Sequence, residues 1–239
     1  MLRITSFFKR REPLSRASAM ESWLSGFFYP ATDAMKAAGA CRAIANLPFD
    51  APVEGLPDDF DAVAEFWFDD LHQAQNGIDK LREVQDGKAW RELTDPTCPA
   101  PWIGELRPVL DAGPLGIKVI RAGRPAKGVD TREALAYWRD RHADVAQTAT
   151  QFWALLRRYT QVPAVDPESA EAYPLQADVG AASIEDMKAA FAHPEYFSIV
   201  QPDERKFSLA GKLVAERLHF ASQRELIALD RLKTSEATS

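Results

Sequence analysis

The chain has 239 residues and a formal net charge of −6, with 46% hydrophobic and 27% charged residues. These values are ordinary for a globular protein of one or two domains. Lys and Arg are scattered without a basic stripe, which argues against nucleic-acid binding, and no apolar run reaches the roughly 18–20 residues that cross a membrane. The two cysteines, Cys41 and Cys98, show no metal or redox spacing. We therefore expect a cytoplasmic protein without nucleic-acid or membrane partners.

The sequence repeats itself at an offset of 115 residues. No gap is needed from residue 2 to residue 48, and the offset becomes 113 further on. The supporting pairs are Leu2 with Ile117, Arg3 with Lys118, Trp23 with Trp138, Asn46 with Gln161, Pro48 with Pro163, and Glu65 with Asp178. Internal similarity of this kind indicates one structural unit used twice. We expect repeats over residues 1–112 and 113–230, followed by a flexible tail over 231–239.

Each copy opens with a short apolar strand and continues into a long helix. The opening strands are expected at residues 2–8 and 117–121. Ser15 and Asp130 stand at the helix starts, where a side-chain oxygen can accept free backbone N–H groups. Pro30 predicts a kink in the first helix, and Gly39 predicts its end. The second helix carries one apolar face, because its inward residues recur at steps of three and four: Leu135, Trp138, His142, Val145, Ala149, Phe152 and Leu156.

After the long helix, the rest of each copy is expected to form the second strand, the third strand, a short helix and the fourth and last strand. The strands that follow the long helices are expected to end at Pro48 and Pro163, the third strands at 62–68 and 175–180, and the last strands near 102–110 and 212–220. Asp70 and Ser183 begin the short helices, and the tail is polar from Thr234. This order is βαββαβ, the split βαβ unit. We predict an α+β fold in which two tandem ferredoxin-like repeats form an intramolecular dimeric α+β barrel, because paired sheets bury their open faces.

Three stretches of the chain resemble the EthD domain of the dimeric α/β-barrel superfamily. Residues 7–15 are similar to its first strand and helix entry, residues 137–143 to its helix motif, and residues 64–71 to its third strand. The resemblance implies work on small molecules. Family members are associated with oxidative breakdown of ethers and aromatics, and superfamily relatives include cofactor-free monooxygenases, dehydratases, cyclases and lactone isomerases. The usual member is one unit that dimerises; here the pair is fused, which does not forbid a homodimer of the fused chain.

The two copies differ at the motif histidine. His142 aligns with Phe27 in the first copy, and an imidazole exchanges protons near neutral pH whereas a phenyl ring does not. We therefore expect the active site in the second copy, with His142 as a general acid or base. The alternative is a buried histidine satisfied by a backbone or carboxylate partner. The first copy is expected to be a degenerate site or a second hydrophobic pocket, in which Tyr29 could bind a ligand.

Three charged residues are further candidates for the site. Arg121 ends the opening strand of the second copy and could hold an anionic group or a developing enolate; the alternative is a surface position. Asp178 and Glu65 are equivalent residues of the third strands, on the face expected toward the barrel interior. Burial there would raise the pKa of a carboxylate unless it is paired. The alternative is an ion pair with Arg42 or Arg157.

The predicted catalytic residues are His142, Arg121 and Asp178, and the predicted substrate-binding residues are Trp138, Tyr159, Tyr29, Phe27, Glu65 and His219. Core packing is the alternative for the aromatic residues. The four histidines show no ligand spacing, so we expect no metal. No glycine-rich nucleotide motif is present, so we expect no nucleotide cofactor.

The leading hypothesis is a cofactor-independent enzyme that acts on a hydrophobic aromatic or carbonyl-bearing molecule by general acid/base catalysis, as an isomerase, lyase or cyclase. A second hypothesis is an oxidoreductase of ether or aromatic degradation. It would be monooxygenase-like or haem-using, with His142 or His219 as the axial ligand. A third is a non-catalytic protein that binds and sequesters a small molecule.

Overall fold

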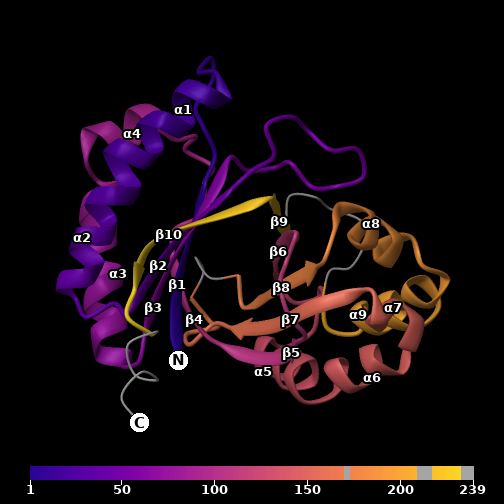
Figure 1. Ribbon diagram of the computed structural model, residues 1–239. Helices are drawn as coiled ribbons and strands as arrows, with labels where there is room; N and C mark the ends of the chain where they lie inside the picture. The colour runs from indigo at the N-terminus through magenta and orange to yellow at the C-terminus, as the bar shows by residue number, and fades with distance from the viewer. Residues whose placement is uncertain (170–172, 209–216, 233–239) are drawn as a thin grey trace, which may run out of the picture. The chain divides into compact units, whose positions relative to one another are not determined.

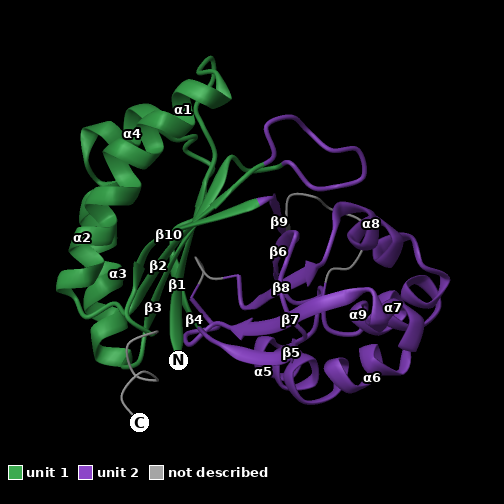
Figure 2. Cartoon of the chain, viewed as in Figure 1, with its two compact units in different colours: residues 1–48, 59–104, 224–239 green, residues 49–58, 105–223 purple. Residues whose placement is uncertain are grey.

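The computed structural model describes residues 1–169, 173–208 and 217–232. The chain divides into two compact units, coloured separately in Figure 2. Unit 1 comprises residues 1–48, 59–104 and 224–239, and unit 2 comprises residues 49–58 and 105–223. Most of the predicted tail, residues 233–239, lies outside the described residues. Each unit is therefore made of segments that are separate along the chain.

Unit 1 is a five-stranded sheet with helices on one face (Figures 1 and 2). The strand order is β10-β2-β3-β1-β4. The strands are β1 Leu2–Phe8, β2 Arg42–Leu47, β3 Ala62–Phe68, β4 Trp102–Glu105 and β10 Arg224–Asp230. The helices are α1 Arg16–Trp23, the π-helix η1 Leu24–Phe28, α2 Tyr29–Ala37, α3 Leu71–Gln85 and α4 Lys88–Leu93.

Unit 2 has the same plan, with strand order β5-β7-β8-β6-β9. Its strands are β5 Arg107–Asp111, β6 Ile117–Gly123, β7 Leu156–Pro163, β8 Leu175–Ala181 and β9 Arg217–Ser222. Its helices are α5 Thr131–Tyr137, the π-helix η2 Trp138–His142, α6 Ala143–Thr148, α7 Thr150–Ala154, α8 Ile184–Ala192, the π-helix η3 Tyr196–Val200 and α9 Gln201–Glu204.

The strand orders confirm the predicted fold class, α+β with two tandem ferredoxin-like βαββαβ repeats. Four strands of each sheet, β4-β1-β3-β2 and β9-β6-β8-β7, form the repeat itself. A fifth strand, β10 or β5, pairs with the edge strand β2 or β7. The expected strand near 102–110 is therefore two strands in different sheets. The strand expected at 212–220 is described from residue 217, because residues 209–216 lie outside the described part.

Local signals placed the helix ends correctly. Ser15 accepts a hydrogen bond from a first-turn backbone N–H of α1, and Asp130 does the same for two such groups of α5. Gly39 follows the end of α2 with φ of 102°, a conformation that glycine adopts without steric cost. Asp70 and Ser183 cap α3 and α8 in the same way.

The expected single long helix of the second repeat is wrong. Its backbone passes through η2 and breaks at Ala149, and Leu156 begins strand β7. The apolar face predicted for this helix still points inward, since most of its side chains are buried. A π-helix lies at the corresponding place in unit 1, and such single turns occur frequently at functional sites.

The alignment of the second strands also needs correction. Strand register places Glu65 opposite Ile44 and Asp178 opposite Thr160. A register shift in β7 between Leu156 and Arg158 accounts for the extra residue. The expected pairing of residue 46 with residue 161 is therefore wrong by one position, which changes the sheet face on which a side chain lies.

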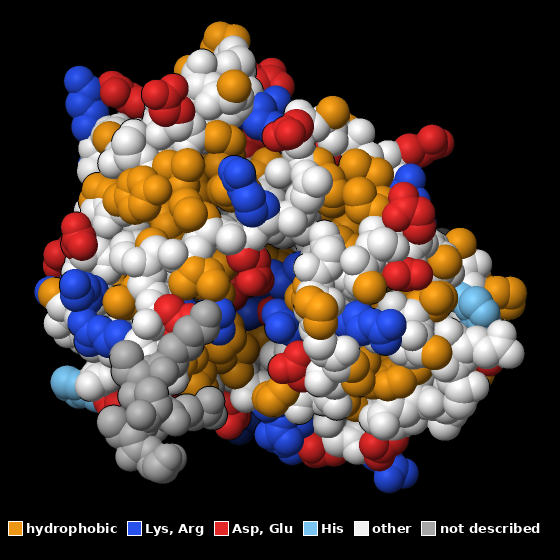
Figure 3. Space-filling view, viewed as in Figure 1, with side chains coloured by type: hydrophobic (Ala, Val, Ile, Leu, Met, Phe, Trp, Pro, Cys, Tyr) orange, Lys and Arg blue, Asp and Glu red, His pale blue; other side chains and the backbone are white. Residues whose placement is uncertain are grey.

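Figure 3 shows acidic and basic side chains interspersed over the face in view. Nowhere in the described ranges does a helix have the length and apolar character needed to cross a membrane.

Candidate active site in unit 2

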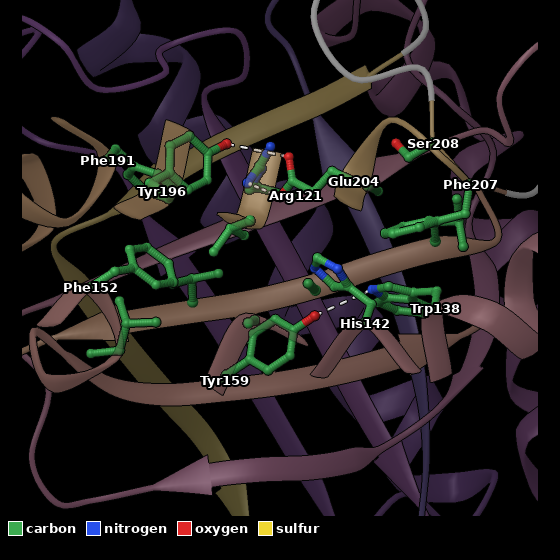
Figure 4. A pocket seen from close by; sticks show the side chains of 18 of the residues that line it. Arg121, Trp138, His142, Phe152, Tyr159, Phe191, Tyr196, Glu204, Phe207 and Ser208 are labelled. Atoms are coloured by element: carbon green, nitrogen blue, oxygen red, sulfur yellow. Dashed lines mark hydrogen bonds and ion pairs between the residues drawn. The ribbon is translucent and has the colours of Figure 1, made fainter. Parts of the chain in front are cut away.

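Unit 2 contains a cavity of about 80 Å³ between its helices and one face of its sheet (Figure 4). Roughly 10–15 Å³ of such space holds one water molecule, so the cavity admits a small organic molecule. Aromatic side chains form much of its wall: Trp138, Phe152, Trp153, Phe191, Tyr196 and Phe207. Polar side chains also line it: Arg121, His142, Tyr159, Glu204, Ser208 and His219. An apolar cavity with a few polar groups is typical of a small-molecule site.

His142 is held in the cavity wall by a buried carboxylate. The distance from His142 Nδ1 to Asp203 Oδ2 is 2.8 Å, and both side chains are almost completely buried. The Phe207 ring lies edge-on to the imidazole, with ring centroids 4.8 Å apart. An ionised carboxylate can only accept hydrogen bonds, so the contact with Asp203 places a proton on Nδ1. This leaves Nε2 of the neutral ring with a lone pair, as a general base requires.

Two further groups keep Asp203 ionised. Tyr137 donates its hydroxyl hydrogen to Oδ1 at 2.6 Å, and Lys206 donates from Nζ to the same oxygen at 2.8 Å. Burial acts to raise the pKa of Asp203, but the hydrogen bonds from Lys206, Tyr137 and His142 lower it overall. Asp203 is therefore an anion at neutral pH and fixes the orientation of the His142 ring.

Tyr159 provides a hydroxyl at the cavity wall. Its oxygen accepts a hydrogen bond from Trp138 Nε1 at 3.3 Å, and Figure 4 shows this hydroxyl on the side of the cavity where the His142 ring lies. Gln161 donates to the Trp138 carbonyl oxygen at 2.8 Å and so fixes the position of η2. Burial raises the pKa of Tyr159 to about 12. The phenol therefore stays protonated and can donate its hydrogen to a ligand oxygen.

Arg121 and Glu204 form an ion pair at another part of the wall. Arg121 Nη1 lies 3.3 Å from Glu204 Oε1, and the Tyr196 hydroxyl donates to Glu204 Oε2 at 3.3 Å (Figure 4). The guanidinium also lies 5.6 Å from the centroid of the Phe191 ring. Burial acts to lower the pKa of Arg121, but Glu204 and Tyr196 raise it above its ordinary value. The arginine therefore keeps its charge, and Glu204 balances it.

Aromatic rings fill the equivalent space in unit 1. Phe27 lies 4.3 Å from the Trp90 ring and 6.0 Å from the Trp23 ring, and Phe8 stacks on Trp23 at 5.7 Å. All but Trp90 are fully buried. The strand registers make Phe8 the counterpart of Gly123. A ring in unit 1 thus occupies a position where unit 2 has no side chain.

The polar groups of the cavity also lack counterparts in unit 1. Ser6 stands at the position of Arg121, and Ala43 at the position of Tyr159. Trp23 is equivalent to Trp138, but its indole Nε1 is buried without a hydrogen-bond partner. Together with the packed rings, these replacements give unit 1 a hydrophobic core at this place.

The structure brings five of the predicted site residues into the cavity wall and leaves four outside. Those that line it are His142, Arg121, Trp138, Tyr159 and His219. Asp178 lies on the opposite sheet face, since its neighbours Ala177 and Val179 line the cavity. Phe27 is a core residue of unit 1, and Tyr29 is 47% exposed on α2.

Glu65 lies in the sheet of unit 1, on the face opposite its helices. It pairs with Arg3 at 3.3 Å and accepts a hydrogen bond from Asn46 at 3.0 Å. The alternative partner Arg42 instead lies over the Trp67 ring at 5.1 Å. Glu65 is thus an ion-paired residue, although its partner differs from the expected one.

Sequence reasoning missed Asp203, Glu204 and Tyr196. These residues lie in the segment of η3 and α9, for which the first repeat has no matching acidic residues. Asp203 is 61 residues from His142, so no local motif links them. The sequence signal for these site residues was the pair of adjacent acids, Asp203 and Glu204, which follows the aromatic pair Tyr196 and Phe197.

Haem does not fit the cavity. Its two histidines, His142 and His219, were the candidate axial ligands, but about 80 Å³ leaves no room for a porphyrin. The contact of His142 Nδ1 with Asp203 does not oppose ligation, since metal-ligating histidines commonly donate their other ring N–H to a carboxylate; the size of the cavity decides. Within the described residues, no group of three or more His, Cys, Asp or Glu side chains is placed to hold a metal ion.

Comparisons with known proteins identify the domain and the fold. Residues 126–209 match the family model of the EthD domain, which confirms the resemblance for this part of the chain. A search of curated proteins gave no match.

Two solved structures cover nearly the whole chain. An anthrone oxidase-like protein matches with a TM-score of 0.60 and 13% identity, over 97% of this chain and 94% of the other. A mutant chlorite dismutase from Candidatus Nitrospira defluvii, in complex with cyanide, matches with a TM-score of 0.53 and 10% identity, over 93% and 90%. At these identities the likeness concerns the fold alone.

Proposed function

We propose that this chain, whose residues 126–209 match the EthD domain, is an enzyme that moves a proton on a small, largely apolar carbonyl compound. The observation that carries the proposal is the buried contact between His142 and Asp203 at the wall of an aromatic-lined cavity. An imidazole fixed in this way has a base at Nε2, and general acid/base catalysis typically contributes about 10²–10⁴-fold in rate.

The reaction begins when the ligand carbonyl oxygen accepts a hydrogen bond from the Tyr159 hydroxyl. His142 Nε2 then removes a proton from the carbon next to the carbonyl: the C–H bond breaks, an N–H bond forms, and the electron pair moves to oxygen as an enolate. Tyr159 stabilises the negative charge that develops there, and Asp203 stabilises the imidazolium. Return of the proton to another carbon gives an isomerisation, and loss of a leaving group gives an elimination.

These steps use groups of the protein alone, which is the basis for proposing a cofactor-independent isomerase, lyase or cyclase. Trp138 and the other aromatic side chains favour a ligand with an aromatic ring, because they offer apolar faces for stacking. We propose no second active site in unit 1, because Phe27 and neighbouring rings fill its equivalent space.

The test measures exchange of the α-protons of 2-indanone for deuterium by proton NMR. We expect the wild-type protein to accelerate exchange and His142→Phe to lose about a hundredfold or more of that acceleration. His72→Phe is the matched control, because His72 is exposed on α3 of unit 1. Equal exchange rates for the wild-type protein and His142→Phe would remove the proposed role. Saturable binding of 2-indanone without proton exchange would instead favour a non-catalytic binding protein.

A second candidate is an oxidase or monooxygenase, favoured by the match over 97% of the chain to an anthrone oxidase-like protein. Proton removal by His142 would give a carbanion that molecular oxygen oxidises, so both candidates share the first step. Oxygen uptake with anthrone as the probe separates them: consumption that depends on His142 supports the oxidase, and exchange without consumption supports the isomerase or lyase.

A further inference from the structure

We propose that Glu204 is a specificity-determining residue, which holds Arg121 in an ion pair and so restricts the unit 2 cavity to uncharged ligands. The inference names the ligand class of the proposed active site and rests on that proposal. Three features carry it: the pairing of the cavity's arginine with Glu204, the pairing of Lys206 with Asp203, and the protonated hydroxyl of Tyr159 in the cavity wall.

The first feature is that Arg121 already has an anionic partner. Glu204 lies 3.3 Å from the guanidinium, and the side chains are 20% and 13% exposed. Tyr196 donates to the other oxygen of Glu204 and so fixes the carboxylate next to the arginine. A ligand carboxylate would have to displace Glu204, which would leave one carboxylate in a mostly buried site without its partner. Such an unpaired charge is costly to bury.

The second feature is that Lys206, close to the contact between His142 and Asp203, is also paired with a carboxylate. Lys206 donates to Asp203 and lies mostly exposed, with a side-chain exposure of 59%. The carboxylate of Asp203 is directed at His142 Nδ1. An anion in the cavity would thus approach the negative charges of Asp203 and Glu204, while Arg121 and Lys206 already have carboxylate partners.

The third feature is Tyr159, a polar group of the cavity wall that suits a neutral acceptor. Tyr159 accepts from Trp138 and stays protonated, since burial raises its pKa to about 12. A neutral carbonyl oxygen can accept the phenol hydrogen without bringing a charge into the cavity. The cavity therefore favours an uncharged aryl carbonyl compound over the corresponding carboxylate.

The experiment compares benzamide with benzoate by isothermal titration calorimetry, because the two ligands match in size and differ in charge at neutral pH. We expect the wild-type protein to bind benzamide more tightly than benzoate. Glu204→Gln frees Arg121 for a charge-assisted hydrogen bond, so the affinity for benzoate should rise by about tenfold to a hundredfold. The affinity for benzamide should change by less than about threefold.

Two further variants test whether the freed guanidinium of Arg121 causes the gain in benzoate affinity. The double variant Arg121→Gln with Glu204→Gln should lose the gain in benzoate affinity, because the gain depends on the freed guanidinium. Glu185→Gln removes the same charge from an exposed position of α8 and should leave both affinities unchanged.

Wild-type affinity for benzoate equal to or above that for benzamide would overturn the inference, and this measurement needs no variant to fold. So would an unchanged benzoate affinity in Glu204→Gln, a gain that persists in the double variant, or failure of both ligands to bind. The proposed function is tested separately by proton exchange. Preference for benzamide without proton exchange would support the proposed ligand class and contradict the proposed reaction. Proton exchange without this preference would support the reaction and contradict the ligand class.

Discussion

Replacement of Asp203 with asparagine keeps the shape of the side chain and removes its charge. Asparagine can still accept from Tyr137 and Lys206 through its carbonyl oxygen. Its amide nitrogen, however, would donate to His142 Nδ1, which moves the ring proton to Nε2. The variant therefore presents the wrong tautomer to the cavity, and we expect proton exchange with 2-indanone to fall by roughly a hundredfold.

The cost in stability follows from the two buried hydrogen bonds of Asp203. A hydrogen bond to a charged group is worth about 1 kcal/mol more than a neutral one. The bonds with His142 and Tyr137 therefore give a loss of about 2 kcal/mol. The bond with Lys206 is left out of this sum, because that side chain is mostly exposed and solvent screens it. For a chain of this size, such a loss lowers Tm by about 4–8 °C.

The difference in Tm between the wild-type and Asp203→Asn proteins should depend on pH in a defined direction. The folded-state pKa of Asp203 lies below the unfolded value of about 3.9. The stabilisation is therefore fully present well above pH 4 and is lost as the pH falls through the lower, folded-state pKa. Thermal unfolding of the wild-type and Asp203→Asn proteins at pH 7 and near pH 3 measures this, with Asp144→Asn as an exposed control on α6. A Tm difference that is absent at pH 7, or that grows on acidification, would refute the reasoning.

Three other substitutions or reactions test single features of the structure. Tyr159→Phe removes the acceptor of the buried Trp138 indole N–H and should cost about 1–3 kcal/mol in urea unfolding; an unchanged midpoint would show that the indole finds another partner. Gly39→Ala places a Cβ at φ of 102° and within 2.8 Å of the Gln73 side chain, so thermal unfolding should reveal a loss of about 1–2 kcal/mol. The half-buried Cys98 thiol, whose pKa desolvation raises to about 12, should react with a chromogenic disulfide reagent at pH 8 far more slowly in the folded than in the unfolded protein; equal rates would contradict the raised pKa.

The sequence by itself determined the repetition of the chain and several helix ends. Ser15 and Asp130 cap their helices because a side-chain oxygen reaches a backbone N–H two or three residues away. The spacing of Trp138 and His142 placed both on the inward face of one helical segment, and the contrast with Phe27 placed the candidate site in the second repeat. Each of these inferences depends on neighbours along the chain or on the comparison of two copies.

The tertiary structure alone decided which side chains meet. Asp203 reaches His142 across 61 residues, because α9 packs beside η2. Strand register, with its shift in β7, set the face of Tyr159 and left Asp178 on the other side of the sheet. Such pairings depend on how whole elements pack and on the register between strands, and neither a periodic pattern nor a capping signal specifies a contact over that distance.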